Sequence, residues 1–406
     1  MSTLSDYLHD NARWLSAGVL LTCLSSFGQT FFIALFAADI QSAFNLSHGG
    51  WGTMYTVGTT ASAIVMVWAG RQADIFRVRT LGAISLIALA LACVAMAVNP
   101  WLWALPLVIF ALRLTGQGMM SHIAAVAMAR WFVATRGRAL SIAALGFSMG
   151  QAFLPIAVVA LMALLDWHVI WLLCAGIALL GVPLLMTLLS KERTPASMAQ
   201  SSDSLGMSGL HWSRKDMLHH PLFWLMVPAI LGPSAFNTAF FFHQVHYATV
   251  VGISTLQMVS YFPFFTAVTV IAMIATGALV DRLGTAKLLP FHQLPMVAAF
   301  VIFATHMLGL GWGFFFLALT AGAQATLIAA FWAEFYGTAH LGAIKAVAAA
   351  VMVLGSAIGP GLTGILIDFG IGIETQYIWV AVYFVLTSLS IWIGISTSRK
   401  LLPSAA

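Results

Sequence analysis

The feature that most constrains this sequence is a series of long apolar stretches whose flanking positive charges alternate from one gap to the next. Of the 406 residues, 61% are hydrophobic and only 7% are charged. This composition excludes a soluble globular domain and indicates an integral membrane protein. A helix needs about 20 residues to cross the hydrocarbon core, because each residue adds about 1.5 Å.

Twelve stretches meet this length requirement. Lipid cannot satisfy the backbone groups of an open strand, and the stretches are too long and uniformly apolar for barrel strands. We therefore predict an all-α integral membrane protein with twelve transmembrane helices. The predicted helices lie at 14–39, 51–70, 80–98, 102–128, 139–165, 168–190, 221–246, 254–280, 288–308, 311–335, 344–368 and 375–398.

The basic residues predict how the chain is oriented. All but one of the seventeen Lys and Arg residues lie at the chain ends or in the gaps that follow even-numbered helices, and the other gaps contain none. The positive-inside rule then places both termini in the cytoplasm and the protein in the cytoplasmic (inner) membrane. Because these charges set orientation, the net charge of +5 does not indicate a nucleic-acid partner. The exception is Arg113, which lies inside the fourth stretch.

The middle of the chain separates two parts of similar length. Residues 191–220 are rich in Ser, Met and charge and lack apolar periodicity, so they are predicted to form a cytoplasmic linker. The N-terminal part is then 1–190 and the C-terminal part 221–406. Each part contains six of the predicted helices.

These two parts repeat the same polar residues at one spacing. Asp74 follows the second helix and Asp281 follows the eighth, 207 positions later. Arg138 and Lys345 lie at the starts of the fifth and eleventh helices and are also 207 positions apart. A shared offset predicts a duplicated unit, and hence two pseudo-symmetric six-helix bundles.

The loop after the second helix of each part resembles the G-x-x-x-D-R-x-G signature of the major facilitator superfamily. The C-terminal copy consists of Gly277, Asp281, Arg282 and Gly284. The N-terminal copy departs from it, with Ile75 in place of the usual Arg and Arg77 in place of the usual Gly. The resemblance covers essentially the whole chain and implies a monomeric transporter that works by alternating access.

The resemblance also implies that these loops latch the two halves together. Asp74 is placed to accept hydrogen bonds from the N-terminus of the eleventh helix, where free N–H groups carry partial positive charge, and Asp281 from that of the fifth. The alternative is that both carboxylates offset nearby arginines in their own loops. The candidate latch residues are Asp74, Arg77, Asp281, Arg282, Arg138, Lys345 and Glu334.

Four segments are more narrowly similar to bacterial carriers of the oxalate/formate and monocarboxylate branch. They lie at 113–122, 129–156, 240–254 and 336–368. Gln151 occupies the position where the drug-efflux branch usually has Pro, which disfavours that branch. The glycines in these segments, among them Gly146, Gly150, Gly355 and Gly359, are predicted to allow close helix crossing rather than to bind substrate.

Several polar residues lie near the predicted centre of the bilayer, where they are costly unless they face a cavity or one another. The resemblance implies that the first, fourth, seventh and tenth helices line a central cavity, and most of these residues lie on those helices. We predict that they bind the substrate. They are Gln29, Arg113, Gln117, Gln151, Asn237 and Gln324.

Arg113 indicates the charge of the substrate. A guanidinium keeps its proton, so in a dry site it needs an anion or several carbonyls. No Asp or Glu lies at a comparable depth. One hypothesis is that a small carboxylate substrate supplies the counterion. The other is a structural arginine bonded to helix carbonyls or to water.

Titratable residues near the outer ends of the helices are candidates for proton coupling or an outer gate. They include His243 and His246 on the seventh helix, with Asp39 and Asp368 on the first and eleventh. The two histidines have the spacing of a metal pair but no evident third ligand, so no metal or other cofactor is predicted. His246 follows Asp39 by 207 positions, so pseudo-symmetry places the two opposite one another.

The function predicted is secondary transport of a small organic anion, a mono- or dicarboxylate, with symport of protons and anion exchange both open. One alternative is efflux of a drug or metabolite by proton antiport, and another is a transporter-like sensor. No Walker A loop is present, so ATP is not the direct energy source. No nucleophile, metal cluster or carboxylate pair gathers at one depth, so an enzyme is not predicted. The expected partners are the anion, protons and the lipid bilayer.

Overall fold

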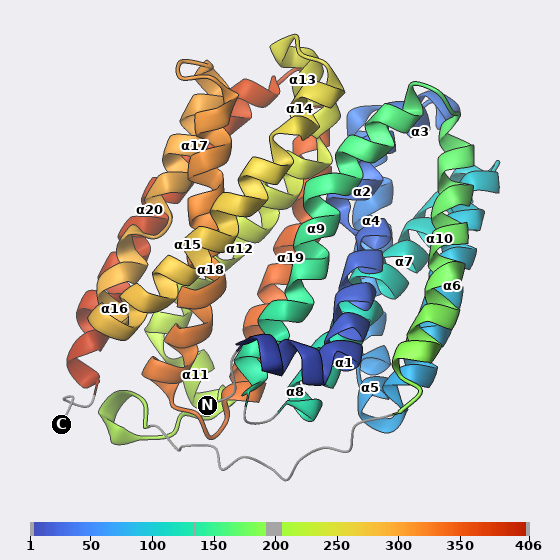
Figure 1. The fold of residues 1–406 in the computed structure, drawn as a ribbon. Coiled ribbons are helices and arrows are strands. Elements are labelled where there is room, and N and C mark those ends of the chain that lie inside the picture. The colour runs from blue at the N-terminus through green and yellow to red at the C-terminus, as the bar shows by residue number, and fades with distance from the viewer. Residues whose placement is uncertain (1–3, 133–134, 192–204, 403–406) are drawn as a thin grey trace. The chain divides into compact units, whose positions relative to one another are not determined.

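The structure is a computed structural model that describes residues 4–132, 135–191 and 205–402, and every regular element in these ranges is a helix (Figure 1). Within these ranges ten helices are long and apolar enough to cross a membrane, or eleven if the bent pair Asp6–Gly28 and Thr30–Phe44 is one span. The 22-residue helix α4 (His48–Ala69) is equally long, but Gly, Thr, His and Trp reduce its hydropathy. With α4, the described residues contain the twelve spans that the sequence predicts.

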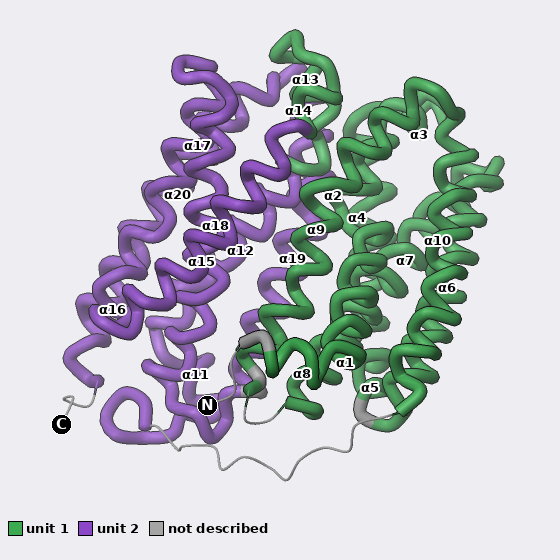
Figure 2. Tube along the Cα trace, in the orientation of Figure 1, with its two compact units in different colours: residues 1–199, 241–259 green, residues 200–240, 260–406 purple. Residues whose placement is uncertain are grey.

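Unit 1 comprises residues 1–199 and 241–259 (Figure 2). Helix α1 packs along α9, and α6 packs along α10. Segment 241–259 clusters with this unit although it belongs in sequence to the C-terminal part. In chain order the helices are α1 (Leu4–Leu24), α2 (Thr30–Ile33), α3 (Ala37–Phe44), α4 (His48–Ala69), α5 (Gln72–Ile75), α6 (Val78–Val98), α7 (Leu105–Leu112), α8 (Ser121–Trp131), α9 (Arg136–Met162), α10 (Trp167–Leu188), α13 (Gln244–Val251) and α14 (Thr255–Ser260), which ends at the unit boundary.

Unit 2 comprises residues 200–240 and 260–406. Helix α18 packs against α15 and α17, and α17 also packs against α20. An apolar core that includes Phe223, Phe331 and Trp332 joins α12 to α18. The helices are α11 (Arg214–His219), α12 (Pro221–Phe242), α15 (Phe262–Leu283), α16 (Thr285–Leu288), α17 (Leu294–Thr305), α18 (Leu310–Tyr336), α19 (Leu341–Asp368) and α20 (Ile373–Ser398).

The 207-residue repeat continues in the backbone conformation. Helices α3 and α13 each have eight residues and begin 207 positions apart. Each ends at a left-handed residue, Asn45 with φ 50° and Gly252 with φ 76°. Two residues later, Ser47 and Ser254 each accept a hydrogen bond from the backbone amide three positions ahead. The same turn therefore joins corresponding helices of the two parts, as a duplicated unit requires.

Four predicted helices are interrupted in the described residues, which corrects the continuous spans predicted at 14–39, 221–246, 254–280 and 288–308; the last two are interrupted at Tyr261 and at residues 292–293. The first changes from α1 to a 3₁₀ turn over Ser25–Gly28 and to extended backbone at Gln29 before α2 begins. The seventh is interrupted at His243, between α12 and α13. Ser and Gly favour the first interruption, because hydroxyls bond the nearby backbone and Gly stabilises a helix poorly.

The glycines of α9 and α19 allow close crossing, as predicted. A Cβ added to Gly146 would collide with the backbone carbonyl of Val19 on α1. A Cβ added to Gly355 would lie 2.6 Å from the carbonyl oxygen of Leu231 on α12. Both contacts are with backbone, which cannot move away as a flexible side chain can. These glycines therefore set the spacing between paired helices within each unit.

Helix α12 contains a proline whose missing N–H is compensated by a neighbouring helix. Pro233 cannot donate to the carbonyl of Ala229, four residues earlier. The fully buried Gln293 donates its Nε2 to that oxygen at 2.6 Å. Thr387 of α20 donates to the Oε1 of Gln293 at 2.6 Å, so the bonds join α12, the start of α17 and α20.

We expect Gln293→Leu to lower the free energy of unfolding by about 1–3 kcal/mol, because it leaves the buried carbonyl of Ala229 without its donor. Thermal unfolding in detergent would measure the change. Thr397→Val, an exposed change on α20 that affects only hydrogen bonds within its own helix, is the matched control and should leave the midpoint almost unchanged. Equal midpoints for the two variants would contradict this account.

Candidate functional site

The candidate site in unit 1 lies where the interruption of the first helix contacts the fourth span. Between α7 and α8, residues Arg113–Met120 form a π-helix, a rare conformation often found at functional sites. The 3₁₀ turn Ser25–Gly28 packs against it. A Cβ added to Gly116 would lie 2.7 Å from the Cα of Gly28, and one added to Gly28 would lie 3.0 Å from the amide nitrogen of Gln117. The two backbones thus meet beside Gln29 and Gln117.

Arg113 lies at this contact and is only 4% exposed. Its Nη1 donates to the carbonyl oxygen of Gly28 at 3.2 Å and to the Oγ1 of Thr30 at 3.3 Å. The guanidinium carbon lies 5.5 Å from the centre of the Tyr55 ring, and the hydroxyls of Tyr55 and Thr30 are 2.5 Å apart. The buried Nε has no hydrogen-bond partner among the described residues. A carbonyl, a hydroxyl and an aromatic face therefore surround this cation.

Thr30 and Tyr55 were missed by the sequence analysis. Each is a single polar residue within an apolar stretch, and such residues are usually assigned to helix packing. Thr30 can accept a hydrogen bond from Arg113 because the helix is interrupted at Gln29. Tyr55 lies on the second span, which was not expected to contribute to the substrate site. The only sequence signal was the Ser-Ser-Phe-Gly-Gln-Thr segment, which has low helix propensity inside an apolar stretch.

The other predicted substrate residues divide between the two units. Gln29 is 9% exposed, and Gln117 and Gln151 are half-buried in unit 1. Asn237 and Gln324 are half-buried in unit 2. The buried Oε1 of Gln117 and Oδ1 of Asn237 have no hydrogen-bond partner in the described part of the chain. Each unit thus holds polar atoms that a ligand could satisfy.

The predicted histidine pair lies beside a third histidine that the sequence analysis missed. His243 is 3% exposed at the junction of α12 and α13, and His246 is half-buried on α13. The ring of His48, the first residue of α4, is centred 4.2 Å from that of His246 and 6.4 Å from that of His243. The described residues contain no group of three His, Cys, Asp or Glu arranged to hold a metal ion.

Helix α13 and the residue before His243 make further contacts with the rest of unit 1. Gln244 donates its Nε2 to the carbonyl oxygen of Phe31 at 2.9 Å. The rings of Phe242 and Trp51 stack, with their centres 5.3 Å apart. These contacts hold the three histidines together at the start of α4.

Asp39 and Asp368 are the two carboxylates predicted to take part in proton coupling or an outer gate. Asp39 is half-buried on α3 and interacts electrostatically with Asp166 and His168. The backbone amide of His168 donates to Asp166 at 2.8 Å, and its imidazole also bonds this carboxylate, which together lower the pKa of Asp166. Asp368 is exposed at the end of α19.

The signature loops are bonded within their own units. Near the end of the fourth span, Arg130 donates to the carbonyl oxygen of Ala73 at 2.9 Å. Near the end of the tenth span, Glu334 accepts from the amide of Thr285 at 3.1 Å, directly after the second signature loop. In both units, therefore, the fourth helix of the six contacts the loop that follows the second, or the residue directly after that loop.

The remaining latch candidates lie near the starts of α6, α9 and α19 or near the end of α15. The guanidinium of Arg138 lies over the ring of Tyr7, 5.1 Å from its centre. The side chain of Asp74 lies outside the described part of the chain. Contacts of these residues with the opposite half stay a prediction. The other exposed candidates are Arg77, Asp281, Arg282 and Lys345.

Twelve spans in two related halves, with polar groups at an interrupted helix, are the architecture of a polytopic membrane carrier. The sequence model of the Major Facilitator Superfamily matches residues 18–312, and the chain belongs to that family. It is therefore a transporter and not an enzyme. No curated protein matches the sequence significantly.

Solved structures of the same fold support this assignment. A bacterial homolog of the human lysosomal transporter Spinster, inward-facing and unoccupied, is 15% identical with a TM-score of 0.71, and the match covers 98% of this chain and 99% of that one. The nucleoside transporter NupG is 13% identical with a TM-score of 0.69, covering 96% and 99%. At these identities the likeness shows the fold alone.

Proposed function

We propose that this transporter carries a small organic anion, a mono- or dicarboxylate, by alternating access. The observation that carries the proposal is the burial of Arg113 with no ion-pair partner among the described residues. A buried cation is stabilised most strongly by a hydrogen-bonded anion, and a carboxylate matches the two-pronged guanidinium. The similarity to the oxalate/formate and monocarboxylate branch agrees with this substrate class.

The surroundings of Arg113 suggest how the anion binds. Its Nη1 is held by Gly28 and Thr30, whereas its Nε lacks a partner. A carboxylate oxygen would take Nε, and the second oxygen would share an Nη donor. Gln29 and Gln117 lie beside this point, and their amides would complete the hydrogen bonds. Gln151, on α9 of the same unit, would contact the rest of the substrate, and a contribution from Asn237 and Gln324 stays a prediction.

Counterflow in liposomes tests this function. Purified protein would be reconstituted with an unlabelled acid inside, and uptake of the labelled acid would be followed for a panel of small mono- and dicarboxylates. We expect transient accumulation with at least one of them and none with apolar cations. Accumulation of cations or apolar drugs alone would favour efflux, and binding without counterflow would favour a sensor.

The outer histidines supply a route for proton coupling. Protonating both His48 and His246 would place two positive charges about 4 Å apart, which costs about 1–4 kcal/mol at effective dielectric constants between those of water and a protein surface. Acid would therefore favour release of α13 from α4. Asp39 and Asp368 are the other outer groups able to carry protons.

We expect His48→Gln to flatten the pH dependence of transport, because it removes the positive charge that would repel protonated His246 and so favour release of α13 from α4. Initial uptake rates between pH 5 and 8 would show this. His9→Gln, at an exposed histidine in α1, is the control and should keep the wild-type profile. A profile unchanged by His48→Gln would show that these histidines do not couple protons to transport.

A further inference from the structure

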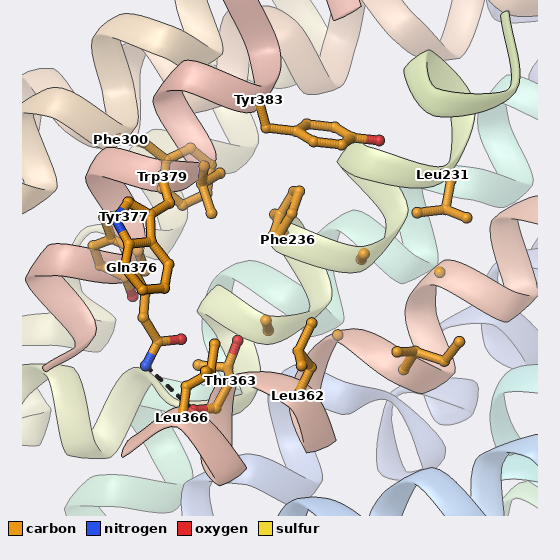
Figure 3. A pocket seen from close by; sticks show the side chains of 16 residues that line it. Leu231, Phe236, Phe300, Leu362, Thr363, Leu366, Gln376, Tyr377, Trp379 and Tyr383 are labelled. Atoms are coloured by element: carbon orange, nitrogen blue, oxygen red, sulfur yellow. Dashed lines mark hydrogen bonds between the residues drawn. The ribbon is translucent and has the colours of Figure 1, made fainter. Parts of the chain in front are cut away.

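Unit 2 contains a cavity that shares no residue with the substrate site proposed above. It has a volume of about 320 Å³ and is bounded by helices α12, α17, α19 and α20 (Figure 3). The rings of Phe236, Phe300 and Tyr383 line it, together with aliphatic residues of α19. Apolar cavities of roughly half this size, about 150 Å³, stay dry and bind small hydrocarbons.

Two of the polar side chains on its wall bond the protein itself. Gln376 donates its Nε2 to the carbonyl oxygens of Thr363, at 3.3 Å, and Ile371, at 2.9 Å. Tyr383 donates its hydroxyl to the carbonyl oxygen of Pro228 at 2.7 Å. These donors therefore need no hydrogen-bond acceptor from a bound molecule. Most of the wall consists of aliphatic and aromatic side chains, which favours a hydrocarbon over a polar molecule or water.

The cavity borders the surface of the helices that faces the bilayer. Ile358, Leu362 and Trp379 line it and are 45%, 50% and 50% exposed. They lie in the middle or outer parts of membrane-spanning helices. The medium in contact with them is consequently lipid, and the hydrocarbon available there is a phospholipid acyl chain.

The length of the cavity is close to the hydrocarbon thickness of one leaflet. Its α19 wall runs from Gly355 to Leu366, which spans about 16 Å at about 1.5 Å per residue. Half of the hydrocarbon core is about 15 Å. Gln376 lies close to the start of α20 and Thr363 close to the end of α19, so the cavity occupies the half of the bilayer that contains those helix ends.

We propose that this cavity is a binding site for one acyl chain of a phospholipid from that leaflet. The chain packs on Phe236, Phe300 and Tyr383 and closes the crevice between α12, α19 and α20. Filling the cavity restores the dispersion contacts that its walls would otherwise lack. The bound chain also lies against the α12–α19 contact that Gly355 and Gly359 make close.

Fluorescence quenching by phospholipids with brominated acyl chains tests the site. The signal of Trp379 is obtained by subtracting the trace of Trp379→Phe from that of the wild type in detergent. Trp392 lies on the same helix, is 55% exposed and does not line the cavity, so Trp392→Phe gives the matched control. We expect quenching of Trp379 to saturate at a lipid fraction at least about tenfold lower than that of Trp392.

Variants that fill the cavity give an independent readout. Thr363→Phe and Ala239→Leu place added bulk in its wall, and either is sufficient if it keeps the wild-type thermal midpoint. We expect both to abolish saturable quenching of Trp379. Equal quenching of Trp379 and Trp392 in the wild type, saturation that survives both variants, or saturation by a brominated free fatty acid but not by the phospholipid would overturn the proposal.

Discussion

Arg113→Gln is expected to reduce the initial rate of uptake of the true substrate by at least about 100-fold, since losing one partner of a buried, hydrogen-bonded charge pair costs about 2–5 kcal/mol. Glutamine retains a donor but not the charge. Arg113→Lys should retain partial activity, because an ammonium keeps the charge without the two-pronged geometry. Uptake of a labelled acid into liposomes measures both variants.

The alternative of a purely structural arginine is tested with the same variants. Arg113 bonds the carbonyl oxygen of Gly28, so its loss also lowers stability. Stabilisation by substrate separates the two roles, because it depends on affinity and not on the initial midpoint. A folded Arg113→Gln protein that is still stabilised by the acid and transports it normally would remove the anion hypothesis. Arg79→Gln, which loses a contact with Met186, is the control for loss of a positive charge.

The number of helices and the repeat could be predicted from sequence because they depend on length and spacing. Lipid forces each apolar stretch to form a helix, so its length identifies a span with little ambiguity. The 207-residue offset from Asp74 to Asp281 recurs in the backbone, where Asn45 and Gly252 occupy matching left-handed turns. Hydropathy was least informative at α4, where Gly and Thr make a spanning helix less apolar.

The interruptions within helices could not be predicted because they depend on contacts between spans. The turn at Ser25–Gly28 packs against a π-helix of the fourth span, about 90 positions later in the chain. Periodicity within one stretch contains no information about such a partner. Thr30, Tyr55 and His48 were missed for the same reason, since each gains its place beside Arg113 or His246 only through packing.

The contact between the first and fourth spans leads to the second large prediction. A Cβ added to Gly28 would collide with the carbonyl oxygen of Leu112 and lie 2.8 Å from the Cα of Gly116. Both are backbone atoms, so the helices must separate. We expect Gly28→Ala to lower the free energy of unfolding by about 3 kcal/mol, the upper part of the usual range for overpacking. It should also impair transport, because separation displaces the Gly28 carbonyl from Arg113.

Gly176→Ala gives a control of opposite sign. This glycine lies within α10, and a Cβ added there meets no atom within 4 Å. Alanine favours a helix over glycine by about 0.5–1 kcal/mol, so this variant should unfold at a slightly higher temperature. Thermal unfolding in detergent and uptake in liposomes would be measured for both proteins. A Gly28→Ala protein as stable and active as Gly176→Ala would show that the spacing of the first and fourth spans does not position Arg113.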